Sequence, residues 1–149
     1  MMTETLAYGF QAEVAVPFED AVALTRDALA ANGFGVLTEI DVKATMKKKL
    51  DVDFRPYVIL GACNPPLAHR ALTAERAIGL LLPCNVVVHA ADAPGRSVVA
   101  VLDPVAQLGI TGRADIRPVA EEVAALLKDV LTEVERRAAP GTVNTKGSN

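Results

Sequence analysis

Apolar residues recur at spacings of three and four near the end of the chain, from Ile116 to Arg137. This spacing places them on one stripe of an α-helix, and acidic and basic side chains occupy the opposite side. Pro118 lies in the first turn, where its missing N–H costs nothing. The pattern predicts one long amphipathic helix over residues 116–137.

Alternation and apolar runs predict about five strands upstream of that helix. Residues 8–16 alternate between apolar and polar side chains, which is the pattern of an antiparallel strand with one wet face. Residues 56–63 are apolar without alternation, which indicates a central strand. A turn sequence at residues 92–95 joins two valine-rich stretches into a hairpin. The predicted strands are residues 8–16, 34–40, 56–63, 84–90 and 97–102.

Three further helices are predicted between the strands. Pro17 opens the first, which stops at Gly33. Asp41 is the expected N-cap of a short second helix over residues 41–50. The third spans residues 67–78. This order predicts an α+β fold, in which an antiparallel sheet of about five strands carries helices on one face.

Length and composition narrow the classes of protein. A chain of 149 residues has the size of one domain, predicted over residues 1–139 with a polar, flexible tail at 140–149. Its hydrophobic content is 51% but its aromatic content only 4%, so aliphatic side chains must build the core. A net charge of −3 argues against nucleic acid as a partner. With no signal-peptide pattern and no membrane span, the expectation is a cytoplasmic protein with reduced thiols.

Two cysteines have similar surroundings, at the end of one predicted strand and the start of the next. Cys63 precedes Asn64, and Cys84 precedes Asn85. An antiparallel return between these strands would make the thiols neighbours, whereas a parallel crossover would leave them roughly 20 Å apart. Neighbouring thiols would suit redox chemistry or a soft metal such as Cu(I). The alternative is that both are small buried core residues.

Other polar residues complete the candidate sites. His69 is the natural third metal ligand to consider, although the first turn of a helix favours a solvent-facing or packing role. Arg55 could bind a carboxylate or phosphate. The lysines at 47–49 fit a solvated face, and could also contact an anion. The candidate ligand site is Cys63, Asn64, Cys84, Asn85 and Arg55, and the candidate metal site is Cys63, Cys84 and His69.

Several of these segments carry a family resemblance. Residues 33–40, 54–66 and 78–88, with Asp103-Pro104 closing the next strand, resemble the bacterial and archaeal family catalogued as domain of unknown function 302. The resemblance covers roughly residues 8–137. It implies the TATA-binding-protein-like fold with a long C-terminal helix, homodimers, and a return connection that brings Cys63 and Cys84 close together. It implies no established activity, cofactor or substrate.

Three functional hypotheses follow. The first is a module that binds a small ligand or soft metal, or handles thiol redox, at the paired cysteines Cys63 and Cys84. The second is a non-catalytic homodimeric interaction protein with structural cysteines. The third is an enzyme that acts on an anionic substrate through Arg55 and Lys47. The cofactor stays unknown, and the expected partners are a second copy and a small ligand or metal ion, without nucleic acid or membrane.

Overall fold

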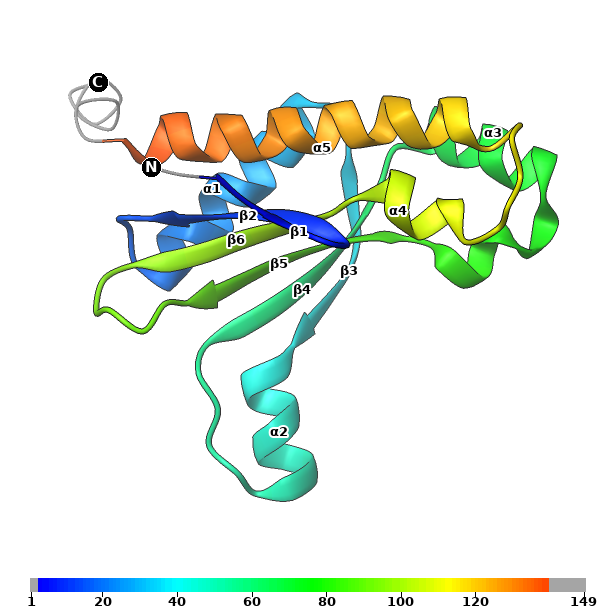
Figure 1. Ribbon diagram of the computed structural model, residues 1–149. Helices are drawn as coiled ribbons and strands as arrows, with labels where there is room; N and C mark the ends of the chain where they lie inside the picture. The colour runs from blue at the N-terminus through cyan, green and yellow to red at the C-terminus, as the bar shows by residue number, and fades with distance from the viewer. Residues whose placement is uncertain (1–2, 140–149) are drawn as a thin grey trace.

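The structure, a computed structural model, describes residues 3–139 and is built on a six-stranded antiparallel sheet (Figure 1). The strands follow the spatial order β1-β2-β6-β5-β4-β3, so β3 and β1 form the two edges. The α+β class and the antiparallel sheet are confirmed. The strands are β1 (Thr3–Leu6), β2 (Gly9–Val14), β3 (Gly35–Asp41), β4 (Tyr57–Cys63), β5 (Cys84–Ala90) and β6 (Ser97–Leu102).

The sixth strand is β1, which the sequence pattern did not indicate. It pairs with β2 through a turn at residues 7–8, so Tyr8 lies in the turn, outside the predicted strand. Four residues are too few to show a period, because alternation needs a longer window to be recognised. The other five strands lie where alternation and apolar runs predicted them, to within two residues at each end.

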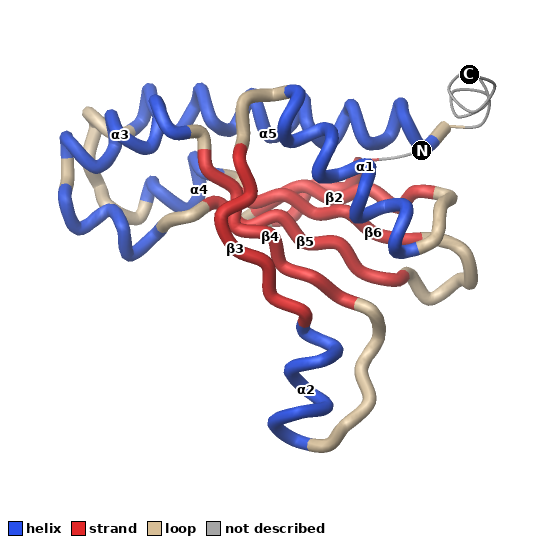
Figure 2. The backbone as a smooth tube through the Cα atoms, turned by 180° about the vertical axis from the view of Figure 1, so that it is seen from behind, coloured by secondary structure: helices blue, strands red, loops and turns tan. Residues whose placement is uncertain are grey.

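Two helices cover one face of the sheet and close the core (Figure 2). These are α1 (Phe18–Ala31) and α5 (Arg117–Ala138), which also pack against each other. Gly33, with φ of 84°, ends the α1 segment in the left-handed conformation that was predicted. The prediction for α5 is confirmed, and its apolar stripe is buried against the sheet. Its buried residues are Val119, Ala120, Val123, Ala124, Leu127, Val130, Leu131, Val134 and Ala138.

The opposite face of the sheet carries no helix within residues 3–139 (Figures 1 and 2). The strand registers place Ile59, Val87 and Ala100 beside one another on this open face. All three are partly exposed, in contrast to the buried residues that alternate with them. His89 also lies on this face, where it is half-buried and its ring stacks on that of Tyr57. The sheet therefore has one packed face and one open face.

The connection from β4 to β5 differs from the single helix predicted over residues 67–78. Helix α3 (Pro65–Ala74) starts earlier, because the Asn64 side chain accepts a hydrogen bond from the Leu67 N–H and two prolines occupy its first positions. It ends at Ala74, and a 3₁₀ helix, η1 (Arg76–Leu81), follows with the Glu75 side chain as its N-cap. The connection is an antiparallel return, so β4 and β5 are neighbours.

Two short helices complete the chain. Helix α2 (Val42–Leu50) projects beyond the sheet from the end of β3, and Asp41 caps it as predicted. Helix α4 (Pro104–Gly109) follows β6, where the sequence indicated only a strand end. The sequence does contain a start signal for α4. Asp103 is its N-cap, which accepts a hydrogen bond from the Val105 N–H, and Pro104 occupies the first position. The predicted tail at 140–149 lies outside the described residues. Within the described part, no helix is both long and apolar enough to cross a membrane.

Candidate functional site

A cavity of about 270 Å³ lies at the end of the sheet where both cysteines are found. Its walls come from the end of β4, the start of β5, α3 and η1, and from α4 and α5 on the far side. None of the lining residues is charged, and Asn64 is the only amide among them. The lining residues are Phe34, Leu37, Ala62, Cys63, Asn64, Leu67, Ala68, Ala71, Leu72, Gly79, Leu82, Pro83, Cys84, Leu108, Val119 and Val123.

Small side chains form part of the cavity wall that faces α5. Along α3, Ala68 and Ala71 line the cavity together with the larger Leu67 and Leu72. Gly79 of η1 also lines it. On the other side, the register shift in β3 between Val36 and Thr38 brings Leu37 to the cavity rim as an unpaired residue.

The two cysteines come together as the antiparallel reading predicted. In the register of β4 and β5, Cys84 lies opposite Ala62, the residue before Cys63, and both cysteines line the cavity. They form no disulfide. Successive residues of a strand point to opposite faces, so Cys63 and Cys84 do not share one face as Ala62 and Cys84 do. The prediction that the two cysteines lie on neighbouring strand ends is therefore confirmed. No disulfide joins them.

The environment of Cys84 favours the neutral thiol. Its side chain is buried, and desolvation, with a smaller contribution from the nearby Cys63, raises the pKa of Cys84 to about 11. Reactive cysteines need the opposite shift, because the thiolate is the nucleophile and the metal ligand. The raised pKa of Cys84 therefore favours the alternative in which this cysteine is a buried core residue.

The two asparagines do not flank one spot. Asn64 lines the cavity, where its side-chain oxygen caps α3 and its amide nitrogen packs against Gly33. Asn85 is exposed and lies opposite Gly61 in the β4–β5 register, so it faces away from Cys84. The sequences around the two cysteines are similar, so they could not reveal this difference. It arises because Asn64 follows the end of β4 and caps α3, whereas Asn85 lies within β5.

Arg55 and His69 lie outside the cavity. Arg55 precedes β4, at the strand end remote from Cys63, and donates hydrogen bonds to the Ala90 carbonyl and to Asp92. His69 is exposed on α3 and is absent from the cavity lining. Across residues 3–139, no three His, Cys, Asp or Glu side chains are grouped so that they could hold a metal ion. The structure does not assemble the predicted metal site of Cys63, Cys84 and His69.

Most of the cavity lining was not recognised as a site from the sequence. Val119 and Val123 belong to the apolar stripe predicted for the last helix, and they are buried, as is Leu67 of α3. Their spacing shows which way they face but not that the facing side chains leave a gap. Leu108 was missed because α4 was missed. The sequence signal for α4 was the N-cap residue Asp103, which would have predicted a helix directly after the strand.

The comparisons with known proteins agree with this fold. The family model described as "Domain of unknown function DUF302" matches residues 10–134. The chain belongs to the DUF302 family. A solved structure from Bacillus stearothermophilus, described as an uncharacterized conserved protein DUF302, is 26% identical to this DUF302 protein. The match covers 85% of this chain and 97% of the other, with a TM-score of 0.78. No curated protein is similar enough to count as a match.

Proposed function

We propose that this DUF302 protein binds a small, uncharged and largely apolar molecule in the cavity between α3 and α5. The observation that carries this proposal is the cavity itself, which is half open to solvent and lined mainly by aliphatic side chains and two thiols. Ligand sites in proteins are typically concave and mostly apolar, with a few placed polar groups. Here those groups are the Asn64 amide and the cysteine thiols.

The side chains that line the cavity support an uncharged ligand. Burying a charge without a partner costs several kcal/mol, and no charged side chain lines this cavity. Within the described residues, every buried side-chain nitrogen and oxygen has a hydrogen-bond partner. The Asn64 oxygen, for example, is already used by the Leu67 N–H. A ligand that offers mainly apolar surface therefore fits this site better than one that needs several hydrogen bonds.

Metal capture and thiol redox chemistry have less support at the same place. Two cysteines without a third ligand leave a metal ion underligated unless the ion is a two-coordinate soft metal. Burial also raises the pKa of Cys84, which disfavours the thiolate that either chemistry requires. A neutral thiol instead behaves as a small, polarisable apolar group, suited to the wall of an apolar site.

Binding can be measured with the uncharged fluorescent dye phenylnaphthylamine. We expect its fluorescence to rise on titration, and the substitution Ala71→Leu, which adds three carbons to the cavity wall, to weaken binding at least about tenfold. The matched control is Ala125→Leu, which adds the same side chain on the exposed side of α5. Equal dye affinity in the Ala71→Leu and Ala125→Leu proteins, or no dye binding by the wild type, would refute the proposal.

A second candidate function is homodimeric interaction through the open face of the sheet. The observation that favours it is the apolar centre of that face, formed by Ile59, Val87, Val98 and Ala100. Glu13 lies next to Val98 in the strand register, and its charge is paired with Arg96. Two copies related by a twofold axis would bury apolar surface against apolar surface, without unpaired charges at the centre.

The dimer proposal predicts a concentration-dependent mass. Sedimentation at micromolar concentration is expected to give twice the chain mass, and Val87→Glu is expected to give the monomer, because it buries a charge at the interface centre. Ala125→Glu, which adds the same charge on the exposed side of α5, should leave the mass unchanged. A wild-type protein that sediments as a monomer would exclude this assembly.

A further inference from the structure

Residues 65–81 form one wall of the cavity and contribute few buried apolar side chains. This segment, the α3–η1 wall, buries three side chains in the core, those of Leu67, Ala71 and Ile78, and the first two of these also line the cavity. Leu72 and Leu80 are exposed by 39% and 87%. Polar contacts from the rest of the protein add to this apolar packing and hold the wall in place.

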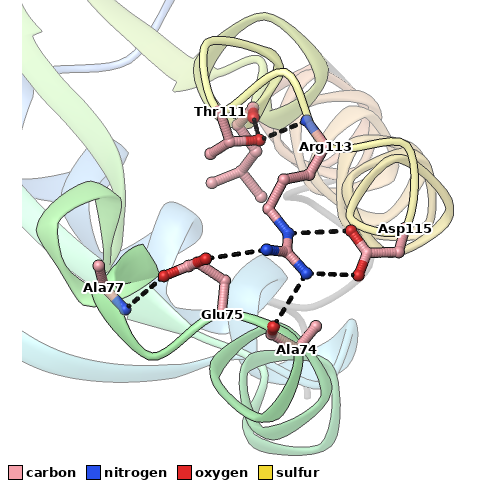
Figure 3. A network of polar contacts seen from close by, with 7 residues as sticks. Ala74, Glu75, Ala77, Thr111, Arg113 and Asp115 are labelled. Atoms are coloured by element: carbon pink, nitrogen blue, oxygen red, sulfur yellow. Dashed lines mark hydrogen bonds and ion pairs between the residues drawn. The ribbon is translucent and has the colours of Figure 1, made fainter.

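Two sets of side-chain contacts hold the wall. Arg70 of α3 donates to Glu122 of α5 at 2.8 Å, and the junction of α3 and η1 is bound by Arg113, in the loop between α4 and α5 (Figure 3). Its Nη1 donates to Glu75 Oε1 at 2.9 Å, and its Nη2 donates to the Ala74 carbonyl at 3.1 Å. Both acceptors lie at the junction of α3 and η1. On its own side, the guanidinium forms a bidentate pair with Asp115, at 3.0 and 2.7 Å. All three guanidinium nitrogens are therefore engaged, and two of them bridge to the wall.

The surrounding bonds connect this network to the cavity. Glu75 Oε2 accepts a hydrogen bond from the Ala77 N–H, which places the carboxylate across the start of η1. The Thr111 hydroxyl accepts from the Arg113 N–H and donates to the carbonyl of Leu108, a lining residue. The hydrogen bond and charge of Arg113 also lower the pKa of Asp115, so both partners stay ionised near neutral pH.

We propose that Arg113 is the latch of the cavity, which ties the α3–η1 wall to the α4–α5 loop and thereby limits how fast ligand enters and leaves. This inference rests on the proposed function and concerns the regulation of the same site. Arg113 is a positioning residue, because it lies outside the cavity and acts through Glu75 and Ala74. An exposed ion pair contributes modestly, but a bidentate fork that also binds a backbone carbonyl contributes more than an isolated pair.

Cys84 provides a reporter of wall opening that does not depend on any ligand. In a Cys63→Ser background, the buried Cys84 thiol should react with methyl methanethiosulfonate only when the wall opens. Arg113→Gln is expected to raise this reaction rate about fivefold or more, and Glu75→Gln should act in the same direction. The matched control is Arg117→Gln, which breaks an ion pair within α5 without touching the wall. Mass spectrometry gives the rate.

Two further measurements separate the latch from the proposed function and from general stability. In Arg113→Gln, association and dissociation of phenylnaphthylamine should both accelerate by similar factors, with little change in Kd. A wild type without dye binding would refute the proposed function, while the Cys84 rates would still decide the latch. Unchanged Cys84 rates in both variants would overturn the latch alone. The latch would also be overturned if the Cys84 reaction accelerated equally in a Val134→Ala protein that has the same global stability as Arg113→Gln.

Discussion

Replacing Leu127 with alanine is expected to lower the free energy of unfolding by about 2–5 kcal/mol. Leu127 lies in the middle of α5 with no exposed surface, where α5 packs across the sheet. The substitution removes buried methyl groups and leaves a cavity that the rigid sheet cannot close. Urea unfolding, followed by circular dichroism, measures the change.

The control for this prediction is Leu50→Ala, at a leucine that is 66% exposed at the end of α2. That change should alter stability by no more than about 0.5 kcal/mol. A loss below about 1 kcal/mol for Leu127→Ala would contradict the packing of α5 described above, because most buried leucines cost more.

The buried thiol of Cys84 should make the protein lose stability in alkali. Burial raises its pKa from the ordinary 9.0 to about 11, so the folded state holds the proton more tightly than the unfolded state does. The stabilisation is fully present below pH 9 and is lost as the pH rises through 11. A shift of this size corresponds to roughly 2–3 kcal/mol.

Urea unfolding at a series of pH values tests this, with the wild type compared against Cys84→Ala. The two proteins differ only at residue 84, so the difference between their stabilities isolates the Cys84 contribution. That difference should shrink by roughly 2–3 kcal/mol between pH 9 and 11. Cys63→Ala should retain most of the alkaline loss, since Cys63 is the lesser cause of the shift. Parallel pH profiles for wild type and Cys84→Ala would contradict the buried, neutral thiol.

The elements in which the apolar pattern repeats many times could be predicted from the sequence. The stripe of α5 repeats over six turns, and the caps at Asp41 and Gly33 mark helix ends by local chemistry that tertiary structure does not override. The short elements could not. Strand β1 has too few residues to show alternation, and α4 was hidden because Asp103-Pro104 reads equally well as a strand end and as a helix start.

The candidate site was predictable only in part. Local sequence placed Cys63 at the end of one strand and Cys84 at the start of the next, and an antiparallel return was enough to make them neighbours. It could not place Asn85 on the opposite face or Arg55 at the far end of β4. The cavity itself depends on unfilled space between α3 and α5, and no periodicity in either helix records how well their facing side chains meet.

The most direct test of the apolar binding site is crystallography of the protein soaked with bromobenzene, using the anomalous signal of bromine. The expected result is a bromine peak inside the cavity, between Cys84 and Val123, which is absent from crystals of Ala71→Leu. Bromine on the open face of the sheet alone, or a cavity without bromine at saturating concentration, would contradict the assignment of this cavity as the ligand site.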